Sequence, residues 1–106
     1  MQNDRNGQIA VIFVSHRTDA DAAGYAAAAE AMDRLAAAQP GYRGVDSARG
    51  PDGIGITVSY WANEAAAIAW RGHAEHSAIR EAGRARWYDW YTVSVTQVTR
   101  SYHWAR

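Results

Sequence analysis

The chain has 106 residues, the size of one domain, and its 11 basic and 11 acidic residues give a formal net charge of zero. This balance argues against nucleic acid and anionic membranes as partners. The absence of cysteine excludes disulfides, thiolate catalysis and cysteine-rich zinc sites, and it is compatible with a reducing cytoplasm.

The start of the chain is polar, and no segment reaches the roughly 18 consecutive apolar residues of a membrane span. We therefore expect a cytoplasmic protein that does not enter membranes. No repeat, linker or low-complexity segment divides the chain, so residues 1–106 are expected to form a single domain.

The first predicted element is a strand over the apolar run QIAVIFVSH, residues 8–16. Alternation places two apolar sets on its opposite faces. One set is Ile9, Val11 and Phe13, and the other is Ala10, Ile12, Val14 and His16. Residues 18–41 then predict a helix of about five turns, because they are rich in alanine and end in Pro40-Gly41.

A hairpin follows, with strands over 42–49 and 54–61 joined by the turn sequence RGPDG. Asn63 is a good N-cap for a second helix that we expect to continue to about Ala82-Gly83. The segment WYDWYTVSVTQVTRSYHW predicts a long last strand. Its hydrophobic phase changes near Thr96-Gln97, which indicates either a bulge or an extension that leaves the sheet.

This order of elements is the α+β, ferredoxin-like βαββαβ plan, a four-stranded antiparallel sheet with both helices on one face. Two helices cannot cover the apolar residues on both faces of the first strand. We therefore expect the bare face to meet a second copy, so that a homodimer forms an α/β barrel and the C-terminal strand reaches across to the partner.

On a helical wheel of about 100° per residue, the second helix has an apolar stripe that should face the sheet. The stripe contains Ala65, Ile68, Gly72 and Ile79. Trp70 lies about 160° from Ile68, His76 lies at the edge of the stripe, and His73 lies about 60° further round, near Arg80. A histidine and arginine flank therefore borders the predicted core stripe.

His73 and His76, spaced i and i+3, could share a metal ion, but no third ligand is evident, so we predict no metal site. The motifs GxSxG and GxGxxG are also absent. The aromatic inventory instead suggests a pocket for a small hydrophobic or aromatic ligand. Its candidate residues are His16, Trp61, Trp70, His73, His76, Arg80, Trp87 and Tyr91. The alternative is that these rings serve only the core and a dimer interface.

The run from Gly55 to Tyr102 contains W-x-x-H-x-E-H, then R-x-x-G-R, then W-Y. It resembles the antibiotic biosynthesis monooxygenase family of small dimeric α+β barrel proteins, in particular an uncharacterised bacterial branch. The resemblance implies a monooxygenase that oxidises a small aromatic, quinol-type compound without a cofactor. The catalytic residues themselves stay unassigned.

The family that the chain resembles also includes members that degrade haem. The alternative function is therefore a non-catalytic dimeric protein that binds a hydrophobic ligand such as haem. Those members have an asparagine at the end of the first strand, a tryptophan on the second helix and an iron-binding histidine ten residues later. Here these positions fall near His16, on Trp70 and on Arg80. Arginine does not ligate iron as a neutral imidazole does, so haem ligation would have to come from His73 or His76.

Overall fold

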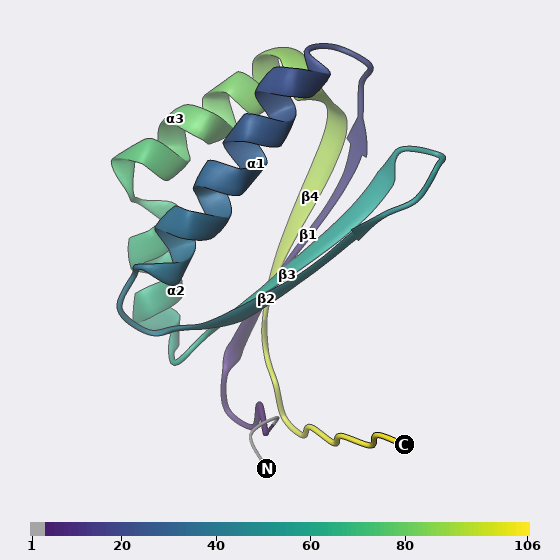
Figure 1. Ribbon diagram of the computed structural model, residues 1–106. Coiled ribbons are helices and arrows are strands. Elements are labelled where there is room, and N and C mark those ends of the chain that lie inside the picture. The colour runs from purple at the N-terminus through teal and green to yellow at the C-terminus, as the bar shows by residue number, and fades with distance from the viewer. Residues whose placement is uncertain (1–3) are drawn as a thin grey trace.

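The computed structural model describes residues 4–106, without the side chains of residues 74 and 75. Its elements are β1 (Ile9–Arg17), α1 (Ala22–Ala37), β2 (Tyr42–Arg49), β3 (Ile54–Trp61), α2 (Glu64–Arg71), α3 (Ala74–Ala82), the π-helical turn η1 (Gly83–Trp87) and β4 (Tyr88–Gln97). Over this range the strands form one antiparallel sheet in the order β2-β3-β1-β4, with the helices on one face (Figure 1). The predicted ferredoxin-like plan is confirmed.

Local sequence signals set most of the element boundaries. The carboxylate of Asp21 accepts a hydrogen bond from the Gly24 N–H at 3.1 Å and caps the start of α1. β2 and β3 have the bounds that the turn sequence predicts, because Gly53 takes a positive φ of 86° that lets the chain reverse. Asn63 caps α2 by accepting from the Ala66 N–H at 2.9 Å.

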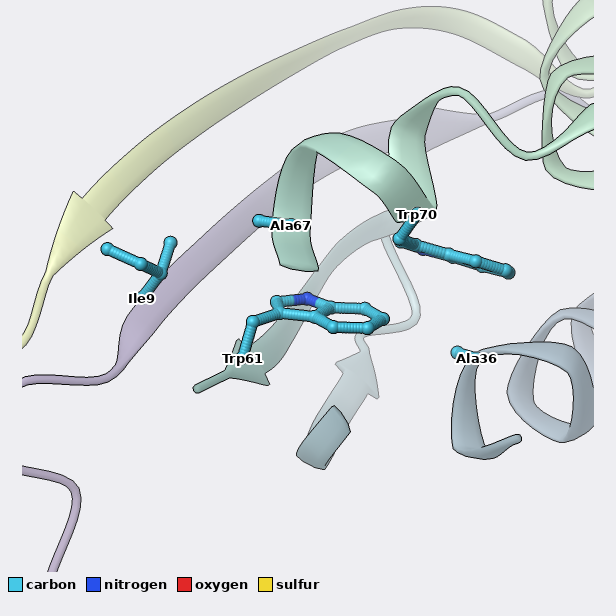
Figure 2. Packing of buried hydrophobic residues seen from close by; sticks show 5 residues of the cluster. All are labelled: Ile9, Ala36, Trp61, Ala67 and Trp70. Carbon is cyan, nitrogen blue, oxygen red and sulfur yellow. The ribbon is translucent and has the colours of Figure 1, made fainter. Parts of the chain in front are cut away.

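The helix-side core lies between β1, β3, α1 and α2 (Figure 2). Its buried members are Ile9, Ala36, Trp61, Ala67 and Trp70. Trp61 is fully buried, and the Tyr42 ring packs edge-on against it at 5.8 Å between ring centroids. Two tryptophans and several alanines thus fill the core of a small domain, which lets the helices approach the sheet closely.

The prediction of one unbroken second helix is wrong. α2 ends at Gly72, whose N–H donates to the Ile68 carbonyl at 3.1 Å. His73 then has extended backbone angles (φ −63°, ψ 130°), which cannot continue an α-helix, and α3 begins with the next residue. The chain enters β4 through η1, so three short helical segments replace the expected rod.

The predicted sheet-facing stripe of the second helix is also wrong. Ile68 is 64 % exposed, whereas Ala67 and Trp70 are the buried residues of α2. The sequence places the small Ala67 where the helix lies close to Ile9, and Trp70 extends into the space between α2 and α1 (Figure 2). Side-chain size decides the orientation here, because only the indole is large enough to fill that space.

The opposite face of the sheet has no helix over it (Figure 1). The pairing registers put Ile12, Val14, Ile56 and Val58 together on this face, and Ile56 is 48 % exposed. β4 ends at Gln97, and the C-terminal segment then extends away from the sheet (Figure 1). The change of hydrophobic phase near Thr96-Gln97 thus marks an extension that leaves the sheet. None of the helices in residues 4–106 has the length and apolar character needed to cross a membrane.

Candidate functional site

Five of the eight candidate residues lie together around Trp70. The Trp61 and Trp70 rings are stacked with 5.9 Å between centroids, and the His76 ring lies on Trp70 at 4.4 Å with an interplanar angle of 16°. His73 is tilted against the same indole at 5.6 Å. Trp70 is only 8 % exposed and packs against these rings, so little of its indole is open to a ligand.

His76 is held in its neutral form by this environment. Its Nδ1 lies 2.9 Å from the Trp70 carbonyl oxygen, which can only accept, so Nδ1 carries the hydrogen. Burial lowers the pKa of His76, and the nearby positive charges of Arg80 and Arg71 lower it further, against the raising effect of the Trp70 hydrogen bond. The imidazole is therefore uncharged at neutral pH.

The remaining polar atoms of this group are packed in protein. Within the described side chains, Nδ1 of His73 and Nε of Arg80 are buried without a hydrogen-bond partner. Arg80 donates through Nη1 to the Arg71 carbonyl at 3.3 Å, which joins α3 to the end of α2.

Trp87 and Tyr91 belong to a second aromatic group at the other end of the sheet, with Phe13, Tyr25 and Tyr88. Trp87 is 4 % exposed, and its Nε1 donates to the Asp21 carboxylate at 3.4 Å. Burial and the neighbouring Tyr25 raise the pKa of Tyr88, so its phenol stays protonated. Trp87 therefore fixes the entry to β4, whereas Tyr91 is only half-buried.

His16 is separated from the other candidates by the sheet itself. Its Nδ1 lies 2.6 Å from Asp89 Oδ2, and its Nε2 lies 3.1 Å from the Asp52 carbonyl oxygen. The ring also stacks with Trp90, which shares the face that the helices leave bare. His16 thus cannot contribute to a pocket under the helices.

Two open hollows border α2. One, of about 320 Å³, lies between the end of α1 and α2 and is lined mainly by small residues: Gln39, Pro40, Gly41, Asn63, Ala65, Ala66, Ala69 and Trp70. The other, of about 350 Å³, lies between the start of α2 and the sheet and is lined by Gly7, Ile9, Ala62, Asn63, Glu64, Val95, Thr96 and Gln97. Neither is lined by His73, His76 or Arg80.

An apolar strip of β4 continues from the second hollow. Tyr91, Val93 and Val95 face the helix side, because Val95 pairs with the core residue Val11 and the others follow in steps of two. Val93 is 39 % and Val95 is 57 % exposed, since α2 and α3 pack mainly on other elements. We name these three residues the inner strip.

The inner strip ends at a contact that the sequence did not indicate. Arg84, in η1, donates through Nε to the hydroxyl oxygen of Tyr91 at 2.8 Å and also lies 3.4 Å from Glu81. A π-helical turn changes the direction of the side chains that follow it, and here it brings Arg84 across to β4. Among the described side chains, which do not include that of Glu75, no group of three or more His, Asp and Glu is arranged to hold a metal ion.

The fold and this arrangement define a class of protein: a ferredoxin-like α+β domain with exposed apolar residues on the helix side of its last strand. The model of the antibiotic biosynthesis monooxygenase family matches residues 8–82, and the chain belongs to this family.

Relatives of the chain agree with this assignment. The chain is 52 % identical over 91 residues to the uncharacterised protein YqjZ of Bacillus subtilis, covering 86 % of this chain and 79 % of YqjZ. The structure of SnoaB, a cofactor-independent oxygenase from Streptomyces nogalater, matches with a TM-score of 0.77 at 13 % identity, over 90 % of this chain and 96 % of SnoaB. Rv0793 from Mycobacterium tuberculosis matches with a TM-score of 0.73 at 19 % identity, over 84 % and 92 % of the two chains. At these identities the two structures show the shared fold.

Proposed function

We propose that the protein is a cofactor-independent monooxygenase that oxidises a small aromatic, quinol-type compound in the cytoplasm. Membership of the antibiotic biosynthesis monooxygenase family carries this proposal, and SnoaB supplies an oxygenase of the same fold. The exposed valines of the inner strip provide an apolar surface on which a flat molecule can lie, and the adjoining hollow adds polar side chains such as Asn63 and Glu64.

The reaction needs little from the protein beyond positioning and control of charge. The activated CH₂ of the substrate loses a proton, and the resulting carbanion transfers one electron to dioxygen. The two radicals combine to a peroxide anion, which takes back the proton that the CH₂ lost. The resulting hydroperoxide loses water and leaves a carbonyl group, so CH₂ and O₂ become C=O and H₂O. An apolar surface such as Val93 and Val95 keeps water from the carbanion, and hydrogen-bond donors stabilise the oxygen on which negative charge develops.

Oxygen consumption tests the proposal. We expect the purified protein to consume oxygen and form quinone with at least one member of a panel of anthrones and hydroquinones. Val95→Arg places a charge on the inner strip and should abolish turnover, whereas Trp104→Arg, at a 74 % exposed tail position, should leave it unchanged. Equal activity in the two variants, or no turnover by the wild type with any of the compounds, contradicts the proposal.

We further propose that the protein acts as a homodimer, with the bare faces of two sheets packed together. The exposed Ile56 and the apolar residues beside it on this face support a buried contact of this kind.

Haem is the ligand of the alternative function, and the residues present fit it poorly. His76 lies flat on Trp70 with its Nδ1 bonded to a carbonyl, and neither hollow is lined by a histidine. We therefore expect no Soret shift when haemin is titrated into the protein. A shift that is lost in His76→Ala would instead favour a haem-binding protein.

A further inference from the structure

Among the described residues, the hydroxyl hydrogen of Tyr91 has no acceptor. A phenol carries one hydrogen and two lone pairs, and Arg84 uses one lone pair by donating to the oxygen at 2.8 Å. In the part of the chain that the structure describes, the Tyr91 hydroxyl donates to no other group. Its hydrogen is therefore free for a molecule outside the protein.

The Tyr91 side chain is held at both ends. Its ring packs against Phe13 of the neighbouring strand at 5.2 Å between centroids, and its oxygen is fixed by Arg84 from the helical layer. Gly83, at the start of η1, leaves room for the neighbouring Tyr88 ring, because a Cβ there would lie 3.0 Å from it. A donor that is already in place loses little freedom when it binds a ligand.

Tyr91 also stands at the end of the open apolar surface. It shares the helix-side face of β4 with Val93 and Val95, and Val95 lines the hollow beside the start of α2. At about 3.4 Å per residue, the Cα atoms of Tyr91 and Val95 are roughly 14 Å apart, a length that accommodates two or three fused rings. A flat ligand on the inner strip can thus extend to the hydroxyl.

The charge of Arg84 selects the kind of atom that binds there. A guanidinium that donates to a phenol oxygen polarises its O–H bond and strengthens it as a donor. Such a donor favours an oxygen that carries partial or full negative charge, as a carbonyl oxygen does when a carbon conjugated with it loses a proton.

We propose that Tyr91 is the hydrogen-bond donor of the ligand site and that the ligand is a fused aromatic compound with an oxygen at the end that meets it. Arg84 is the positioning residue that holds and polarises the Tyr91 hydroxyl. The inference rests on the proposed function for the class of ligand, but it does not require that the ligand be oxidised.

Binding of 2-naphthol, compared with 2-methylnaphthalene, tests this inference by titration of the protein's tryptophan fluorescence. We expect the wild type to bind 2-naphthol about tenfold more tightly than 2-methylnaphthalene, which has no hydroxyl. One hydrogen bond from the polarised Tyr91 hydroxyl accounts for a difference of this size. Tyr91→Phe should remove this preference and leave the affinity for 2-methylnaphthalene unchanged. Tyr102→Phe, at an 86 % exposed position, is the matched control and should keep the preference.

Arg84 is tested through two substitutions. Arg84→Gln should reduce the preference for 2-naphthol, and Arg84→Lys, which keeps the charge, should restore part of it. Equal loss in both variants contradicts the positioning role, and a wild type that binds neither compound or shows no preference overturns the inference. If the preference depends on Tyr91 while no quinol or anthrone is oxidised, the proposed monooxygenase function fails and the assignment of Tyr91 stands.

Discussion

Trp61 is the residue on which the helix-side core depends most. It is fully buried, and it contacts Tyr42 on one strand and Trp70 on α2. Trp61→Ala should lower the free energy of unfolding by about 3–5 kcal/mol, because it removes a large buried side chain and leaves a cavity. Trp104→Ala, on the exposed tail, should change it by less than about 0.5 kcal/mol. Urea unfolding of the two variants measures both effects, and similar losses would contradict this view of the core.

His76 makes stability depend on pH in a defined direction. Burial and neighbouring cations lower its pKa in the folded state below the ordinary value of 6.5. In the window below 6.5 the unfolded chain binds more protons than the folded one, so unfolding becomes easier as the pH falls. The stability that neutral His76 provides is therefore complete above pH 6.5 and is lost as the pH drops toward the folded-state pKa.

The variant His76→Gln tests this effect, because its amide can still donate to the Trp70 carbonyl but does not titrate. We expect its thermal midpoint to fall less between pH 7.5 and 5 than that of the wild type. His103→Gln, at an exposed tail position, should keep the wild-type pH dependence. Parallel curves for wild type and His76→Gln would show that other groups cause the acid sensitivity.

At the scale of the elements, the turn between α1 and β2 sets the position of α2. Gly41 has a φ of +84°, and a Cβ there would lie 2.5 Å from the Cβ of Ala66 on α2. Gly7 has a similar φ of +81°, but a Cβ there would meet nothing within 4 Å. Substitutions at Gly41 and Gly7 therefore separate two costs in folding stability: that of the left-handed backbone and that of the clash with α2.

Gly41→Ala should therefore destabilise the fold more than Gly7→Ala. A left-handed conformation costs an alanine roughly 1–2 kcal/mol at either position, and the clash with Ala66 adds to this at Gly41. Denaturant unfolding of both variants gives the difference directly. Equal losses would mean that α2 moves away from the turn at little cost.

The segment from β2 to α3 shows which element boundaries can be predicted from sequence patterns and which cannot. The strand bounds of 42–49 and 54–61 follow from the turn chemistry of Pro51 and Gly53, which acts over a few residues. The break at Gly72 does not follow, because the surrounding alanines favour helix and the wheel shows a continuous stripe. Packing of Trp70 against Trp61 overrides that periodicity and turns Ile68 outward.

At the scale of the whole molecule, the eight candidate pocket residues that the sequence predicts do not lie in one place. Rings serve equally well as core and as ligand surface, and sequence does not tell which rings stack on each other. Trp70 and His76 are thus covered, and His16 lies across the sheet. The phase of Tyr91, Val93 and Val95 was visible in the sequence, but their exposure was not, because it depends on α2 and α3 packing mainly on other elements.

The bare sheet face predicts the assembly of the molecule. Ile56 is 48 % exposed on this face, whereas Ile68 is 64 % exposed on α2, on the other side of the sheet. If the bare faces of two copies pack together, Ile56→Arg buries an unpaired charge in the interface and should give monomers. Ile68→Arg should leave the dimer intact because its side chain lies outside the contact. Size-exclusion chromatography with light scattering at micromolar concentration measures the mass of each variant. A wild type with the mass of one chain, or equal dissociation by the two variants, would rule out a dimer formed through this face.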